Sequence, residues 1–193
     1  MWWLLLIAAG VGVYIWSTYN ALVAQKTRIG ASVQEIGYQL KRQAGLIPNL
    51  IASVKGYLEH EREIFEKITQ VRQAVLAAAG SGDAQEMINA GAQLQAALAP
   101  IRAVFESNPQ LQAAGTVTQL MEELRDTADK VMYSRRTLID LTADYNIRLA
   151  IFPSNVIAKA FNFVPEKGLI MPEEGEAATT VKVEELQTPT VKL

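Results

Sequence analysis

The chain has no cysteine, a single histidine and no excess of positive charge, and these absences exclude several classes of protein. Without cysteine there is no disulfide, no thiolate nucleophile, no iron–sulfur cluster and no cysteine-ligated zinc. Lys and Arg number 18 against 20 Asp and Glu, and a net charge of -2 supplies no basic field for nucleic-acid phosphates. We therefore expect no nucleic-acid binding, and any enzyme chemistry would depend on carboxylates, Lys, Ser or Tyr.

Charge is also missing from the first 25 residues, where residues 2–16 read WWLLLIAAGVGVYIW. At ~1.5 Å per residue, a helix from Trp2 to about Tyr19 is just long enough for a ~30 Å hydrocarbon core. Aromatic side chains lie at both ends of this run, as in the two interface belts of a membrane helix. The sequence predicts a single transmembrane anchor over 1–19, with these membrane-facing residues: Trp2, Trp3, Leu4, Leu5, Leu6, Ile7, Tyr14, Trp16 and Tyr19.

Two other interpretations of this segment stay open: a cleaved secretory signal and a buried helix of a soluble domain. A signal peptide usually has a basic region before its apolar run, and here only Met1 precedes it. The first charges, Lys26 and Arg28, lie after the segment and favour a single-pass protein of the cell membrane with its body in the cytoplasm. Long domains can be translocated regardless of such charges, so the orientation also stays open.

Apolar residues after the anchor recur with a helical period, and alternating strand-like runs are nearly absent before the C-terminal region. This pattern predicts an all-α fold, in which the anchor helix continues into an up-and-down bundle of four long helices over residues 20–164. Gly45 resembles a helix C-cap and Pro48 a first-turn proline, so we expect a tight hairpin there. The expected helices span about 20–44, 47–79, 83–106, 116–152 and, as a short last helix, 154–162.

If the long helices alternate in direction, the short last helix lies at the membrane-proximal end of the bundle. Its expected interface or membrane-proximal residues are Val156, Ile157, Lys159, Phe161 and Phe163. They either cap the bundle or lie in the headgroup region, and capping is favoured because so short a helix buries little area. The sequence after Pro165 is rich in Glu and lacks aromatic residues, so residues 165–193 are expected to form a disordered acidic tail.

Four segments together resemble one protein family. They are YNALVAQ from Tyr19, QLKRQAGLIPNLIASVKGYLEHE from Gln39, SNPQLQAAGTVTQLMEEL from Ser107 and YNIRLAIFPSNVIAKAFNF from Tyr145. They resemble the signature segments of the bacterial LemA family. The resemblance implies an N-terminally anchored four-helix bundle with a bromodomain-like core, and it implies no reaction, because the family has no assigned enzymatic activity.

No catalytic, cofactor or metal constellation stands out. A zinc-protease reading of His60 and Glu61 requires a second histidine at position 64, where Ile64 stands. Phosphate loops and nucleophile elbows are not found either. We therefore expect no cofactor, no metal and no small-molecule substrate.

The leading functional expectation is a non-enzymatic membrane scaffold that contacts the lipid bilayer and self-associates or binds a partner membrane protein. The alternative is an adaptor or sensor that regulates a neighbouring membrane protein through its anchor helix. A third class, a hydrolase built on carboxylates such as Glu59, Glu61 and Glu63, would need a buried cleft.

Overall fold

The structure, a computed structural model, describes residues 1–57 and 62–169, and all regular secondary structure in these ranges is helical. The expected all-α fold is confirmed. In chain order the elements are α1 (Trp2–Val54), the 3₁₀ turn η1 (Lys55–Tyr57), α2 (Arg62–Ser81), α3 (Ala84–Ser107), α4 (Pro109–Ala113), α5 (Gly115–Ala150) and α6 (Ser154–Ala160).

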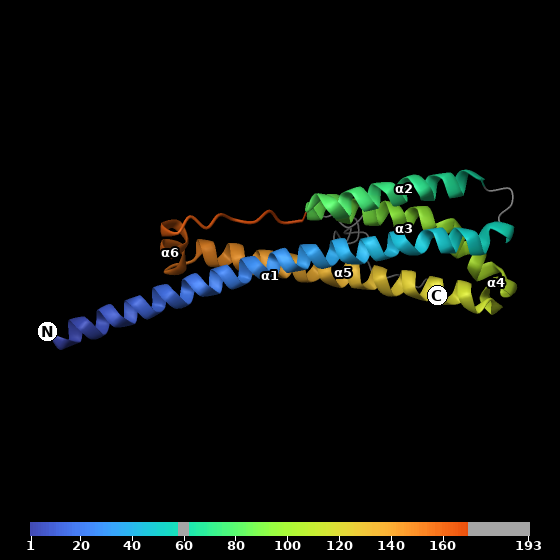
Figure 1. Cartoon of the computed structure of the whole chain (residues 1–193). Helices are drawn as coiled ribbons and strands as arrows, with labels where there is room; N and C mark the ends of the chain where they lie inside the picture. Colours follow the sequence, from blue (N-terminus) through green and yellow to red (C-terminus); the bar gives the residue numbers. More distant parts are fainter. Residues whose placement is uncertain (58–61, 170–193) are drawn as a thin grey trace, which may run out of the picture.

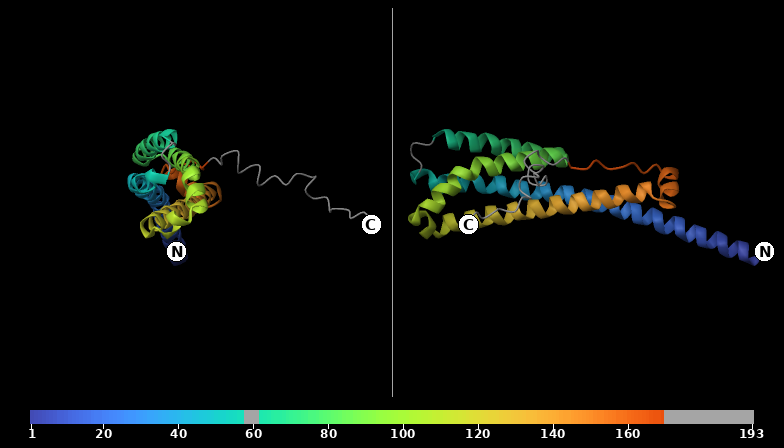
Figure 2. Two further views of the ribbon diagram at one scale, coloured as in Figure 1. Left: turned by 90° about the vertical axis from the view of Figure 1, so that its right-hand side faces the viewer. Right: turned by 180° about the vertical axis from the view of Figure 1, so that it is seen from behind.

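The four long helices α1, α2, α3 and α5 alternate in direction, so that successive helices run antiparallel (Figure 1). The N-terminal part of α1 extends alone beyond one end of the bundle, and α6 lies at that same end. The view from behind gives the same arrangement (Figure 2). The expectation that the last short helix lies where the first helix leaves the bundle is therefore correct.

The predicted hairpin at Gly45 to Pro48 is wrong, because α1 continues without a break to Val54 and contains Pro48 in its interior. Proline has no N–H, so the carbonyl of Ala44, four residues earlier, loses its helical donor. Arg72 of α2 replaces it: its Nε lies 2.8 Å from the carbonyl oxygen of Ala44 and donates to it. Since Ala44 is fully buried, this side chain supplies a hydrogen bond that water cannot make.

The buried residues of α1 keep the same seven-residue spacing before and after Pro48. Buried residues recur at Leu22, Ile29, Ile36, Gln43 and Leu50, seven apart throughout. A true hairpin would have reset this register. The turn lies instead after Val54, so the second helix begins at Arg62 rather than at 47.

The connection between α2 and α3 follows local rules that the sequence displays. Gly82 has a φ of 78°, a conformation that glycine adopts without strain. Asp83 caps α3 by accepting hydrogen bonds from the backbone N–H groups of Gln85 at 2.7 Å and Glu86 at 3.1 Å. Beside this turn, a Cβ on Gly37 of α1 would lie 3.3 Å from the carbonyl oxygen of Ala79, so glycine permits the close approach of the two helices.

One short helix was not predicted. From the sequence, the third helix is expected to end at 106 and the fourth long helix to begin at 116. In the structure, α4 occupies part of the interval between them. Asn108 caps α4 by accepting from the N–H of Gln110 at 3.0 Å, and Pro109 occupies its first turn.

The chain after α6 turns back along the bundle. Residues 163–169 run from α6 toward the turn between α2 and α3, as Figures 1 and 2 both show. Phe163 and Leu169 pack against the core. The predicted tail therefore starts too early at 165, because residues 165–169 lie on the bundle; residues 170–193 fall outside the described ranges.

Candidate functional site

The bundle is open along one edge, between α3 and α5. Both helices pack on α1, but they do not pack closely on each other. A groove of about 760 Å³ follows this edge and is floored by Leu40 and Gln43 of α1. Gly91, Ala92 and Ala128 on its walls have little or no side chain to fill it.

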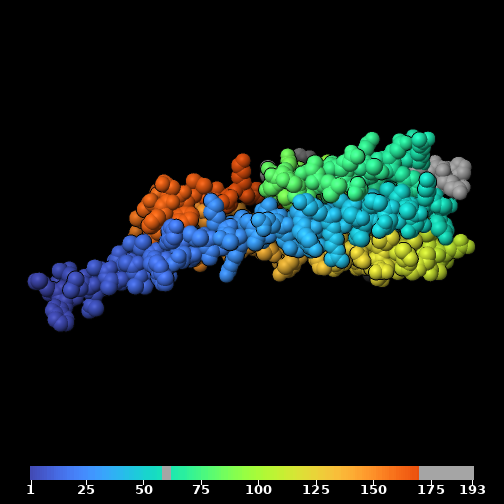
Figure 3. All heavy atoms as spheres, viewed as in Figure 1, coloured from blue at the N-terminus to red at the C-terminus, as the bar shows by residue number. Residues whose placement is uncertain are grey.

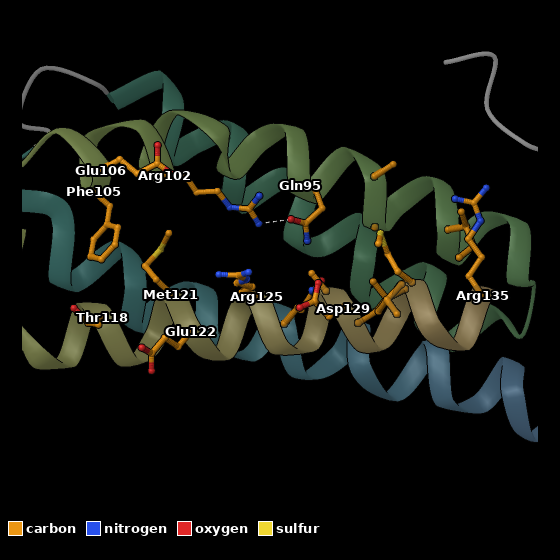
Figure 4. Close-up of a pocket in the computed structure, with 18 residues that line it drawn as sticks. Gln95, Arg102, Phe105, Glu106, Thr118, Met121, Glu122, Arg125, Asp129 and Arg135 are labelled. Carbon is orange, nitrogen blue, oxygen red and sulfur yellow. Dashed lines mark hydrogen bonds between the residues drawn. The ribbon is translucent and has the colours of Figure 1, made fainter. Parts of the chain in front are cut away.

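The groove combines apolar side chains with charged side chains of both signs: Arg102, Arg125 and Arg135 line it together with Glu106, Glu122 and Asp129. Phe105 of α3 and Met121 of α5 point toward one another at one end, and Arg102 and Arg125 project into the space beside them, whereas Glu122 points away (Figure 4). Arg102 donates to Oε1 of Gln95 across two turns of α3. Guanidinium groups recognise carboxylates in bidentate geometry, so Arg102 and Arg125 suit acidic side chains of an apolar segment, whereas Asp129 suits a basic one.

Gln43 adds a polar group to the floor of this groove. Its side chain is 1% exposed, and its Nε2 donates to the carbonyl of Leu124 at 3.4 Å. No described residue donates to its buried Oε1.

A second group of residues fixes the chain end near the α1 projection. Asn146 donates from Nδ2 to the carbonyl of Glu166 at 2.9 Å and accepts from the N–H of Glu166 at 3.0 Å. The hydroxyl of Tyr145 donates to the carbonyl of Val164 at 3.2 Å. Lys26 of α1 pairs with the carboxylate of Glu166 at 3.3 Å. These contacts join α1, α5 and residues 164–166.

Burial raises the pKa of Tyr145 above its usual 10.0, while Lys26 acts in the opposite direction and Glu166 adds to the increase. The side chain is fully buried, and its hydroxyl donates a hydrogen bond that the phenolate cannot make. Tyr145 is therefore a structural donor rather than an acid or base exposed to a substrate.

The predicted anchor residues from Trp2 to Tyr14 are exposed on the projecting part of α1, whereas Tyr19 contacts Phe161 and Phe163. Figure 3 shows this end of α1 extending alone beyond the other helices. Trp2 is 86% exposed and Leu6 is 74% exposed, although both are strongly apolar. Among the described residues α1 is the one helix long and apolar enough to cross a membrane, a property that signal sequences share.

The predicted residues of the last helix divide between two faces. Ile157 is buried, Phe163 is half-buried, and Val156, Lys159 and Phe161 are exposed. Tyr19 of α1 lies against both aromatic rings, with ring centroids 4.9 Å from Phe161 and 5.7 Å from Phe163.

The carboxylate site considered for a hydrolase is not assembled within the described ranges. Glu63 is exposed on α2, and Glu59, His60 and Glu61 lie outside the described residues. In residues 1–57 and 62–169 no group of three or more His, Asp or Glu side chains is arranged to hold a metal ion.

The groove was not predicted from the sequence, and neither were the backbone groups of Val164 and Glu166 that Tyr145 and Asn146 contact. The small residues Gly91, Ala92 and Ala128 are the signal that was available, since they fall on the inner faces of two helices without filling the space between them. The helix α1 packs closely on α5, and only the three-dimensional arrangement shows that α3 lies apart from α5 and leaves the groove open.

The fold and its groove define an elongated, all-helical bundle whose first helix extends beyond the core as an exposed apolar rod. A sequence profile of the LemA family matches residues 32–184, and the chain therefore belongs to the LemA family. The match covers most of the bundle and begins after the exposed apolar part of α1. No curated protein matches the chain.

Proposed function

We propose that this protein is a non-enzymatic, single-pass membrane scaffold that self-associates through the groove between α3 and α5. The observation that carries the proposal is the open edge of the bundle, an apolar groove with Arg102 and Arg125 directed into it. A bundle that served only as a compact spacer would gain stability by closing this edge.

The chain itself contains a segment with the chemistry that the groove suits. Between residues 172 and 186 it carries the acidic residues Glu173, Glu174, Glu176, Glu184 and Glu185. Val181 and Val183 alternate with polar residues in the same stretch. Insertion of this stretch from a second copy into the groove would join its carboxylates to the two arginines.

The membrane part of the proposal depends on the exposed apolar end of α1. Burying those side chains in lipid removes a large apolar surface from water, at about 25 cal/mol per Å². We propose the cell membrane as the location and the cytoplasm as the side occupied by the bundle, from Lys26 and Arg28 just after the apolar run.

The test measures the mass of the full-length protein in mild detergent over a range of concentrations. Ala92→Trp fills the groove, and Ala103→Trp is the matched control, an exposed alanine of the same helix that does not line the groove. We expect the unchanged chain and Ala103→Trp to assemble, and Ala92→Trp to remain monomeric. Assembly of Ala92→Trp at the same concentration would show that the groove is not the interface.

A second variant tests the proposed occupant separately. Replacing Glu173, Glu174 and Glu176 by Gln removes charge and keeps side-chain volume. If the acidic stretch binds the arginines, this variant assembles more weakly, and salt weakens assembly of the unchanged chain. A monomer under all conditions would refute self-association.

One observation favours the alternative of an adaptor or sensor: α1 is a single helix from its apolar end to Val54 in the core. Such a helix transmits rotation or displacement from the membrane to the bundle. Replacing residues 2–19 by an unrelated membrane helix discriminates the two functions, because a scaffold tolerates the exchange and a coupler loses regulation of its neighbour.

A further inference from the structure

The end of the bundle from which α1 projects carries an unusual number of exposed apolar side chains. Phe152 is 80% exposed, Val156 is 58% exposed and Phe161 is 50% exposed. We call this surface the apolar end; its members are Ile147, Ile151, Phe152, Val156, Phe161 and Val164. Ile157 and Ala158 on the opposite side of α6 are buried in the bundle, so α6 is apolar on both faces.

The apolar end lies at the level where the apolar part of α1 finishes. Tyr19, the last aromatic residue of the predicted span, contacts the rings of Phe161 and Phe163. If the span is in the bilayer, this contact places Phe161 at the interface between hydrocarbon and headgroups, where aromatic side chains are enriched. Continuity with the apolar helix therefore identifies a lipid surface as the occupant of this face.

A shallow hollow between α1 and the bundle supports the same occupant. It has a volume of about 310 Å³ and is lined by Gly12, Ile15, Trp16, Tyr19 and Phe161. Four of these residues belong to the predicted span, and Gly12 offers no side chain to fill the space. The hollow opens beside the lipid-facing helix and has the apolar character that an acyl chain requires.

The charges of this region fit phosphate headgroups. From residue 145 to residue 165 the sequence contains no Asp or Glu, and its charged residues are Arg148 and Lys159. Both are exposed. Of the acidic residues that flank this stretch, Glu166 is paired with Lys26 at 3.3 Å and Asp144 lies one helical turn before Arg148. An apolar surface with positive charge on its exposed side chains is the pattern of interfacial membrane helices.

We propose that the apolar end lies in the headgroup region of the bilayer, with α6 parallel to the membrane surface and a lipid acyl chain in the hollow between α1 and Phe161. This inference rests on the membrane anchoring that the proposed function includes. It gives α6 two roles: its inner face closes the core, and its outer face fixes the bundle against the membrane.

The test uses the absence of cysteine from the chain, which allows a single environment-sensitive nitrobenzoxadiazole dye at any chosen position. Full-length variants Val156→Cys, Val11→Cys and Tyr133→Cys are labelled and reconstituted in phosphatidylcholine–phosphatidylglycerol vesicles. Val11 lies near the middle of the predicted span. Tyr133 is a matched exposed position on α5 within the bundle, 74% exposed. Nitroxide groups at the headgroup, or shallow or deep on the acyl chains, then report the depth of each dye.

We expect deep nitroxides to quench the dye at 11, headgroup and shallow nitroxides to quench the dye at 156, and no nitroxide to quench the dye at 133. Ile151→Cys, at a residue 51% exposed on the same surface, repeats the measurement if the Val156 variant does not fold.

The failures of the two proposals are distinguishable. Quenching at 11 with none at 156 or 151 overturns the inference and leaves the anchor intact. No quenching at 11 removes the anchor itself. A dye at 156 that is shifted to the blue without nitroxide quenching, and only at high protein-to-lipid ratio, shows that a second copy covers this surface and also overturns the inference.

Discussion

Removing the hydrogen bond from Arg72 to the carbonyl of Ala44 should lower the free energy of unfolding by a measurable amount. Arg72→Met keeps an apolar stem of similar length and removes the donor. The carbonyl of Ala44 is then buried without a partner, because Pro48 cannot supply an N–H. Leaving a buried acceptor unpaired costs about 1–3 kcal/mol, so we expect the free energy of unfolding to fall by that amount.

A double-mutant cycle separates this cause from lost packing. Pro48→Ala gives residue 48 an N–H that can donate to the carbonyl of Ala44 within the helix. In that background Arg72→Met should cost less than about 1 kcal/mol, since the carbonyl keeps a partner. The difference between the two backgrounds is the coupling energy between positions 48 and 72.

The assay is urea unfolding of the full-length protein in mild detergent, followed by the far-ultraviolet signal of the helices. Arg62→Met is the matched control on α2, because the 3.2 Å contact of Arg62 with Glu66 is exposed and worth little. An equal cost of Arg72→Met in both backgrounds would refute the argument that Arg72 acts by satisfying the carbonyl of Ala44.

Two further predictions concern the buried hydroxyl of Tyr145 and the close approach of α1 to α2 at Gly37. The pKa of Tyr145 is higher in the folded chain than the usual 10.0, so the stability that it contributes is complete below that pH and is lost as pH rises through the folded value. Unfolding midpoints at about pH 8 and about pH 11 should therefore differ less in Tyr145→Phe than in the unchanged chain. Gly37→Leu should lower the free energy of unfolding by about 1–3 kcal/mol, because its Cβ meets the backbone of Ala79 at 3.3 Å. Gly30→Leu, which enters open space on the same helix, should not destabilise the chain in the same urea experiment; equal losses at both positions would contradict the packing argument.

The helical class was predictable because the core residues repeat with a period that only a helix satisfies. The boundary at Pro48 was not, since Gly45 and Pro48 together form a strong local stop signal. What overrides that signal is the side chain of Arg72, 28 positions after Ala44, which donates the missing hydrogen bond to the carbonyl of Ala44. The unchanged heptad phase from Leu22 to Leu50 was the one sequence feature that already contradicted a break.

The predicted length of the second helix was wrong, because residues 47–79 were expected and α2 has only 20 residues. The excess length lies in α1 and α5, where residues 154–169 cover part of both. The groove depends on the separation of α3 from α5, which neither helix's own sequence determines.

The unbroken first helix has a geometric consequence for the proposed anchor. An α-helix turns by about 100° and rises ~1.5 Å with each residue. If its apolar end spans the bilayer, the continuous helix α1 fixes the height of the groove above the membrane and the direction in which the groove opens relative to the faces of the membrane-spanning part. Inserting one residue after Tyr19 would swing the groove by roughly a quarter turn about the helix axis. The contacts of Leu22 and the later residues of α1 would stay unchanged, whereas those of Tyr19 with Phe161 and Phe163 would be lost. In the proposed assembly, copies whose membrane helices pack in one orientation would present their grooves in one fixed relative direction.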